Sequence, residues 1–174
     1  MYYTTYQAPT GKITLASAGK SLCGLWNGTH KYIYKDMEKQ DDLPIFNATK
    51  MWLGSYFAGK KPSIKELPLA PVGSEFRQAV WKILCGIPYG ETITYGDIAK
   101  AMAKKMKIPK MASQAVGGAV GHNPISIIIP CHRVVGANGS LTGYGGGIHI
   151  KIKLLEHEGV DMSRFFVPTR GTAL

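Results

Sequence analysis

One cysteine in the chain is followed directly by a histidine and an arginine. The stretch IIIPCHRVVG places Cys131 and His132 immediately after an apolar run that ends at Pro130. A cysteine becomes a strong nucleophile as the thiolate, and a nearby basic group favours that form. In an extended segment the two side chains would point to opposite faces, whereas a bend after Pro130 or a bridging water would bring the imidazole into play. The stretch predicts either a nucleophilic thiol or a buried cysteine beside a structural histidine.

Three nearby features favour the nucleophile. Asn123 precedes Pro124 at the end of a helical pattern, where its side chain can tie a loop by hydrogen bonds. The stretch LTGYGGGIH places four glycines around Tyr144, and glycine lets the backbone approach a flat ligand closely. Glu158 follows a helical pattern near its end, where the helix dipole disfavours a carboxylate. A residue in a locally unfavourable place fits a role in a site, and a solvated surface position is the alternative for a single glutamate.

The composition limits the class of protein. The chain has 174 residues, of which 45% are hydrophobic, so one compact domain or two small ones are expected. An apolar run of about 18 residues, as a membrane span needs, is missing, and so is a secretory signal, which favours the cytoplasm. The three cysteines are widely spaced, which argues against a disulfide framework. The net charge of +10 favours a polyanionic partner such as nucleic acid, although it also serves solubility.

The first half of the chain predicts strands followed by a helix. Residues 1–28 are expected to form strands, because the stretch GKITLASAG alternates between apolar and polar positions, and a turn at Gly19 and Lys20 suggests an antiparallel pair. Residues 46–57 have a helical pattern, with Met51, Trp52, Tyr56 and Phe57 expected on one face. Residues 59–74 are rich in proline and glycine and are interpreted as a linker. We therefore expect a supporting domain over 1–70 and a second domain over 71–174.

The second half predicts helices around the Cys131 stretch. Ser74 is a suitable N-cap for the helix that follows it, and Gly159 a suitable end for the last helix. Residues 95–104 and 112–121 form two consecutive helical patterns that resemble a helix-turn-helix. The second of these contains several glycines and alanines. Small side chains let a helix approach either a neighbouring helix or a DNA groove closely, and both alternatives stay open from the pattern alone.

These motifs together resemble one family. GGAVGHNPISIIIPCHRVVG, with IPYGETITYGDIA before it and GYGGGIHIKIKLLEHEG after it, is similar to the O6-alkylguanine-DNA alkyltransferases, also called methylated-DNA–protein-cysteine methyltransferases. The likeness covers most of residues 73–159, and the first half matches only in general layout. It implies an α+β fold. The N-terminal domain would be ribonuclease-H-like, with a small antiparallel sheet and a helix, and the C-terminal domain mainly helical and winged-helix-like.

The resemblance also implies an activity and the roles of five residues. The alkyl group of O6-alkylguanine, and of O4-alkylthymine, in double-stranded DNA would pass irreversibly to Cys131 after the nucleotide flips out. His132 would relay a proton through water and Glu158 would orient it. Asn123 would brace the turn between the binding helix and the active-site loop, and Tyr95 would donate to the departing guanine. The protein would act once, as a monomer, without a cofactor.

Further residues are implied to contact the base or the DNA. The Val134 carbonyl would read the exocyclic amine of the base. The other substrate-binding residues implied are Tyr144, Gly145, Gly146, Val120 and Lys151. Those implied to contact DNA from the minor groove are Thr94, Ser113, Gln114, Ala115, Gly118 and Arg133.

The chain departs from the family pattern at two positions. Gln114 occupies the place where the family often has an arginine that fills the gap left by the flipped base, so weaker DNA affinity is expected. Gly145 replaces a serine of the base pocket. Some members bind zinc in the first domain, but Cys23 and His30 do not support such a site, and no metal is predicted.

Two other functions remain open from the residues. A cysteine hydrolase also needs a cysteine, a histidine and an orienting group, but it would turn over many times. A non-catalytic module that binds DNA lesions or regulates transcription would keep its whole function after Cys131→Ser. The stoichiometry of the reaction separates single-turnover alkyl transfer from a hydrolase. The Cys131→Ser substitution separates both of these from the non-catalytic module.

Overall fold

The structure, a computed structural model, describes residues 1–28 and 36–169. It consists of two compact units, Met1–Val72 with Pro124–Ile128 and Gly73–Asn123 with Ile129–Leu174. A short segment from the second half of the sequence thus belongs to the first unit. It is held there by backbone hydrogen bonds, because the amide of Leu25 donates to the carbonyl of Pro124 at 2.8 Å. None of the helices in the described ranges is long and apolar enough to cross a membrane.

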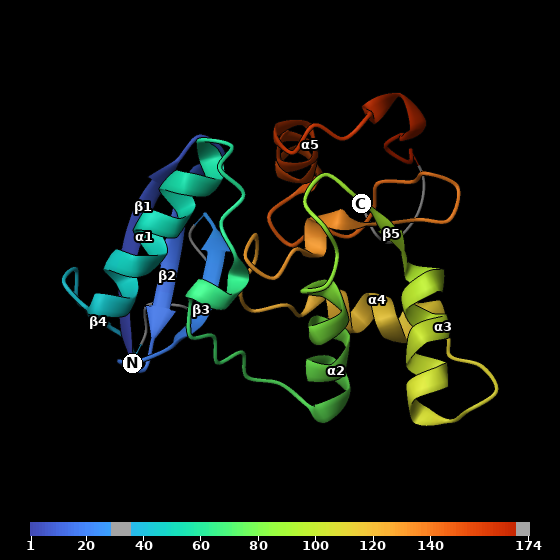
Figure 1. Cartoon of the computed structure of the whole chain (residues 1–174), viewed down its shortest axis with the longest axis horizontal. Helices are drawn as coiled ribbons and strands as arrows, with labels where there is room; N and C mark the ends of the chain where they lie inside the picture. Colours follow the sequence, from blue (N-terminus) through green and yellow to red (C-terminus); the bar gives the residue numbers. More distant parts are fainter. Residues whose placement is uncertain (29–35, 170–174) are drawn as a thin grey trace. The chain divides into compact units, whose positions relative to one another are not determined.

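In its described residues the first unit is a four-stranded sheet with one helix (Figure 1). β1 (Tyr2–Ala8), β2 (Gly11–Ser17) and β3 (Leu22–Asn27) pair antiparallel, as the alternating pattern predicted. β4 (Glu38–Lys39) adds a parallel edge to β1, so the sheet is mixed. The order is β3-β2-β1-β4.

The helix of this unit, α1 (Pro44–Phe57), packs on the sheet through Trp52, Leu53 and Tyr56, which are buried. Met51 is 75% exposed, so its expected place on the buried face was wrong. Met51 lies about 100° from Trp52 and about 200° from Leu53 around the helix, so it points away from the buried side that these two residues form. The proline-rich segment that follows contains one 3-10 turn, η1 (Ile64–Glu66).

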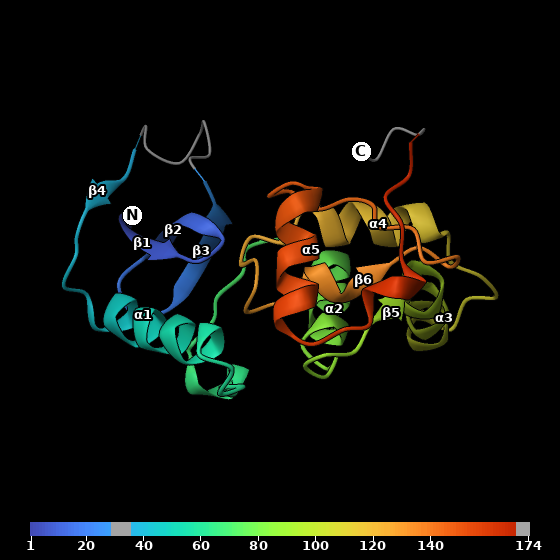
Figure 2. The same cartoon turned by 90° about the horizontal axis from the view of Figure 1, so that it is seen from above.

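Up to residue 169, the second unit carries four α-helices and two very short strands. α2 (Glu75–Leu84) begins after Ser74, whose hydroxyl accepts the amide hydrogen of Arg77 and so confirms the predicted N-cap. β5 (Ile93–Thr94) and β6 (Val134–Val135) pair in parallel and lie between α5 (Ile148–His157) and α3 in Figures 1 and 2. Two 3-10 turns complete the unit, η2 (Cys131–Arg133) and η3 (Met162–Arg164).

A helix-turn-helix forms at the predicted place. α3 (Tyr95–Met106) and α4 (Ser113–Gly121) pack together, and Thr94 caps the first of them by accepting the amide hydrogen of Asp97 at 3.0 Å. The indole of Trp81 on α2 donates to the carbonyl of Ala119 at 2.8 Å, and this hydrogen bond joins α2 to α4. The buried side of α4 carries Val116, Ala119 and Val120. Its exposed side carries Ser113, Gln114, Ala115 and Gly118.

Candidate active site

The backbone bends sharply before Cys131. The Cys131 amide donates to the Ile129 carbonyl at 2.8 Å around Pro130, whose φ of −81° and ψ of 64° are those of an inverse γ-turn. The chain then enters the 3-10 turn Cys131–Arg133. Of the two arrangements open from the sequence, the structure has the bend after Pro130 rather than an extended strand. The isoleucines before it are buried but form no strand.

Glu158 lies at the centre of a buried network. Its carboxylate accepts from His132 Nε2 at 2.6 Å and from Arg133 Nε and Nη2 at 2.8 and 3.0 Å. The amide of Gly90 donates to Glu158 Oε2 at 3.2 Å, while Arg133 Nη1 donates to the Ile87 carbonyl at 2.6 Å. The side chains of Glu158 and His132 are fully buried. Each of the two carboxylate oxygens of Glu158 therefore accepts hydrogen bonds from two donors.

This network fixes the protonation of the histidine. Burial would raise the pKa of Glu158, but hydrogen bonds from His132 and Arg133 lower it well below its ordinary range. Burial lowers the pKa of His132, and the attraction of Glu158 only partly offsets this. The ring is therefore neutral at pH 7 with Nε2–H donating to the carboxylate, which leaves Nδ1 as the basic nitrogen. Nδ1 is buried and has no hydrogen-bond partner among the residues described.

A second network joins Tyr95 and Lys151 through one carbonyl. The ammonium of Lys151 donates to the carbonyls of Val134 at 2.6 Å and Thr142 at 2.8 Å. The hydroxyl of Tyr95 donates to the same Thr142 carbonyl at 3.1 Å. Burial lowers the pKa of Lys151 to about 8, and negative charge on Cys131 acts in the opposite direction. Burial raises the pKa of Tyr95, so its hydroxyl keeps its proton and remains a donor.

Cys131 is electrostatically coupled to both of these side chains. A thiolate there raises the pKa of Lys151 and contributes to the raised pKa of Tyr95. Such coupling is mutual, so a charged Lys151 stabilises the thiolate form of Cys131. Cys131 itself is 6% exposed. The second unit thus couples the Cys131 sulfur to a cation, Lys151, and carries a neutral base on the next residue, His132.

A pocket of about 390 Å³ opens next to Tyr144. This volume lies within the range of small-molecule sites. Tyr95 borders the pocket, because a Cβ built at Gly143 would lie 3.3 Å from its hydroxyl and one built at Gly117 would lie 4.0 Å from its ring. The residues that line it are Gly117, Gly121, Gly143, Tyr144, Gly145, Gly147 and Ile148.

The structure places the predicted site residues in the two hydrogen-bond networks, in the pocket and elsewhere in the second unit. Cys131, His132, Glu158, Tyr95, Lys151 and the Val134 carbonyl belong to the networks above. Tyr144 and Gly145 line the pocket, while Gly146 is not among its lining residues. Asn123 is buried, and its amide donates to the Ile129 carbonyl at 2.8 Å, as a brace for the turn requires. Val120 is buried in the side of α4 opposite to Gln114.

Two of the expected contacts are corrected by the structure. Arg133 was expected to contact DNA, but its guanidinium points inward onto Glu158 and only 9% of its side chain is exposed. Lys151 was expected to bind substrate, but its side chain is fully buried and donates to two backbone carbonyls. The sequence could not distinguish a buried cation from an exposed one in a basic chain.

Three residues of the site were missed by sequence reasoning. Ile87, Gly90 and Thr142 act through backbone groups, which no side-chain pattern reveals. Gly90 has a φ of +81°, and a Cβ added there would come within 2.9 Å of the Glu158 carbonyl. No pattern in the sequence indicates that the turn at residues 88–90 lies close to Glu158.

The prediction of no metal concerned Cys23 and His30. Cys23 is half-buried, and its thiol donates to the carbonyl of Ala16 at 3.4 Å. His30 lies outside the described residues. Over residues 1–28 and 36–169, the structure groups no three His, Cys, Asp or Glu side chains in a way that could hold a metal ion.

Two family profiles match the chain almost end to end. Residues 1–71 match the ribonuclease-like domain of 6-O-methylguanine DNA methyltransferase. Residues 75–160 match the DNA-binding domain of the same family.

Relatives and solved structures agree with these profiles. The methylated-DNA–protein-cysteine methyltransferase of Haemophilus influenzae is 43% identical over 91% of this chain and 86% of its own length. That of Methanosarcina acetivorans is 45% identical over 91% of this chain and 99% of its own. The crystal structure of Mycobacterium tuberculosis OGT in complex with DNA is 43% identical, with a TM-score of 0.77 over 95% of each chain. An O6-methylguanine DNA methyltransferase from Methanococcus jannaschii, 29% identical, has a TM-score of 0.65 over 98% of this chain and 99% of that one. The chain therefore belongs to the 6-O-methylguanine DNA methyltransferase family.

Proposed function

We propose that this protein repairs DNA by transferring the alkyl group of O6-alkylguanine to its own Cys131. The observation that carries the proposal is the 2.6 Å hydrogen bond between His132 Nε2 and Glu158, which leaves the buried Nδ1 without a partner among the described residues and able to act as a base. A water between Nδ1 and the sulfur would pass the thiol proton to the imidazole. The Lys151 ammonium then favours the thiolate that forms.

The transfer follows from the chemistry of the thiolate. The sulfur attacks the alkyl carbon, a carbon–sulfur bond forms and the bond from carbon to guanine O6 breaks. The electron pair passes to the guanine, which leaves more readily when a donor neutralises its charge. Tyr95 can be that donor, because Lys151 continues to satisfy the Thr142 carbonyl when the tyrosine hydroxyl turns away. The thioether product has no water-labile bond, so each molecule reacts once.

The helix-turn-helix supplies the surface for the DNA. The exposed side of α4 is formed by small residues around Ala115 and Gly118, which allow a close approach to the minor groove. The target base is stacked in the duplex, so it must flip out at a cost of a few kcal/mol. The pocket beside Tyr144 would receive it. The Mycobacterium tuberculosis relative was solved with DNA, which supports duplex DNA as the partner here.

Intact-mass measurement tests the proposal directly. After incubation with a duplex containing O6-methylguanine, every protein molecule should gain the mass of one methyl group in place of one proton. Peptide mapping should locate that methyl on Cys131. Release of methanol, or repair of more than one lesion per chain, would instead identify a hydrolase. Because the reaction needs a reduced thiol, we place the protein in the cytoplasm.

Gln114 should tune the affinity for DNA rather than the chemistry. Its side chain is exposed in the first turn of α4, where it can hydrogen-bond to the base left unpaired by flipping. Gln114→Arg should tighten duplex binding, since it adds a cation beside the phosphates, and Gln114→Ala should weaken it. Fluorescence anisotropy with an O6-methylguanine duplex and the unreactive Cys131→Ser background measures both. Equal affinities in all three proteins would show that position 114 is idle.

The His132 network should make the protein sensitive to acid. The pKa of His132 is lowered from 6.5 in the folded state, so below pH 6.5 the unfolded chain binds a proton that the folded chain does not. This stability is present above pH 6.5 and is lost as the pH falls through the folded pKa. Glu158, whose pKa is also lowered, adds a further loss below its ordinary pKa of 4.5.

Urea unfolding from pH 7.5 down to pH 4 measures this effect. His132→Gln should flatten the dependence of the unfolding free energy on pH between 6.5 and 5. The matched control is His122→Gln, which removes an exposed histidine at the end of α4 and should leave the slope unchanged. Identical slopes in the two variants would contradict the assignment of a buried neutral imidazole.

A further inference from the structure

The positive charge of the chain is concentrated in one segment. Residues 98–155 contain eight lysines and arginines and neither aspartate nor glutamate. Two of the eight, Arg133 and Lys151, are buried in the site described above. Five of the others are lysines that fall within residues 100–110, at the end of α3 and in the connection to α4, and all five are exposed.

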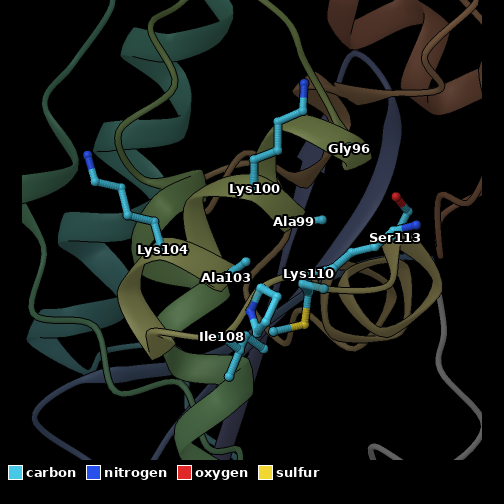
Figure 3. A pocket seen from close by; sticks show the side chains of 10 residues that line it. Gly96, Ala99, Lys100, Ala103, Lys104, Ile108, Lys110 and Ser113 are labelled. Atoms are coloured by element: carbon cyan, nitrogen blue, oxygen red, sulfur yellow. The ribbon is translucent and has the colours of Figure 1, made fainter.

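Three of these lysines line a groove on the helix-turn-helix. The groove has a volume of about 520 Å³ and runs along α3 and the segment that leads to Ser113. Lys100 and Lys104 extend from the same helix and Lys110 lies on the connecting segment (Figure 3). The one acidic neighbour, among the described residues that form ion pairs with these lysines, is Asp97, 3.7 Å from Lys100 and itself exposed. A pair of this kind is weak and leaves the ammonium available.

The close spacing of these lysines destabilises the protein itself. Lys100 and Lys104 are four residues apart on α3, and like charges at this spacing destabilise a helix. Lys104 and Lys105 gain from their place in the last turn of α3, where cations suit the helix dipole. The helix dipole does not account for Lys100, which lies near the middle of the helix, or for Lys110, which lies beyond its end. A polyanion lying along the groove would stabilise all of them together.

The groove is continuous with the proposed DNA surface. Ser113, the first residue of α4, lines the groove and stands next to Gln114 on the exposed side of that helix. Gly96, which also lines the groove, follows Thr94 and Tyr95 at the start of α3. A duplex placed against α4 therefore has a strand of phosphates that can continue along the lysines.

We propose that Lys100, Lys104 and Lys110 bind the phosphate backbone of duplex DNA beside the lesion, as a second contact surface next to α4. The inference rests on the proposed function, because it takes α4 as the helix that meets the duplex. The contacts carry no sequence information, since ammonium groups bind phosphates as point charges. They lengthen the stretch of duplex that the protein covers and hold it while the nucleotide flips.

Salt dependence of binding tests the surface. Each phosphate contact contributes about −0.9 to the slope of log K against log salt. The triple variant Lys100→Gln, Lys104→Gln, Lys110→Gln should therefore bind an unmodified duplex with a slope less steep by about 2 to 3. Its affinity near physiological salt should fall by about tenfold or more. Fluorescence anisotropy over a range of salt concentrations gives both quantities.

A matched variant separates local contacts from net charge. Lys20→Gln, Lys60→Gln, Lys65→Gln removes three exposed lysines of the first unit, and we expect it to keep the wild-type slope. Equal loss in the two triple variants, or no loss in the groove variant, would overturn the proposal. Thermal melting checks that both are folded.

The chemistry gives an independent readout. Transfer from free O6-methylguanine base, which carries no phosphate, should proceed at the wild-type rate in the groove variant. A lower rate with the free base would show that the lysines act on the active site and would overturn their role as phosphate contacts. If the wild type transferred no methyl group from the damaged duplex, the proposed function would fail. The salt dependence of binding in the two triple variants would still decide whether the lysines bind DNA.

Discussion

Replacement of Cys131 by serine is expected to abolish methyl transfer and to leave duplex binding intact. Serine keeps nearly the same shape, but its hydroxyl is far harder to ionise than a thiol and is a weak nucleophile without a strong base. Neither the Lys151 ammonium nor the neutral His132 can make up that difference. Intact-mass measurement after incubation with an O6-methylguanine duplex should therefore find the variant unmodified.

The control is a second cysteine in the same unit. Cys85 is half-buried at the end of α2, and burial raises the pKa of its thiol. Cys85→Ser should accept one methyl group per molecule, like the wild type. Methyl transfer to the Cys131→Ser protein, or its loss in Cys85→Ser, would assign the chemistry to another thiol. If repair in cells survived Cys131→Ser, the non-catalytic lesion-binding alternative would replace the proposal.

Glu158→Gln should reduce both stability and reactivity. The amide keeps the shape of the side chain, but it leaves Arg133 as a buried cation without a counter-charge. Removing one partner of a buried ion pair typically costs about 3–5 kcal/mol of unfolding free energy. The imidazole also loses the anion that orients it, so the rate of methyl transfer should fall by about 100-fold, in the range by which general acid–base catalysis contributes. Urea unfolding and single-turnover kinetics measure the two effects.

A second substitution separates stability from orientation. Arg133→Met in the Glu158→Gln background removes the orphaned cation and should recover much of the stability, while the transfer rate stays low. Glu156→Gln, an exposed carboxylate on α5, is the control and should change neither quantity. Recovery of the rate together with the stability would mean that Glu158 acts only by holding the fold.

Much of the site could be predicted because its chemistry depends on side chains. A lone thiol, an adjacent imidazole and a carboxylate at a helix end are visible in the sequence, and the structure brings His132 and Glu158 together as expected. The longer helices and the first strands followed from their periodicity, with Ser74 as a predicted cap. The roles of these residues in the reaction stay predictions until the variants are measured.

The features that the sequence did not predict depend on the direction of side chains and on backbone groups. Arg133 directly follows His132 in the sequence, and only the 3-10 turn decides that it faces Glu158 rather than DNA. The Thr142 carbonyl joins Tyr95 to Lys151 whatever side chain residue 142 carries. The parallel edge strand β4 has two residues, too few for a periodic signal.

Position 90 shows how far the requirements of this site reach beyond its reactive groups. The residue there contributes only an amide hydrogen, yet a single added carbon would crowd the chain around Glu158 and demand an unfavourable backbone angle. A missense change at this codon would thus count as an active-site lesion. Any attempt to diversify the protein by random mutagenesis should find this turn as intolerant as the nucleophile itself.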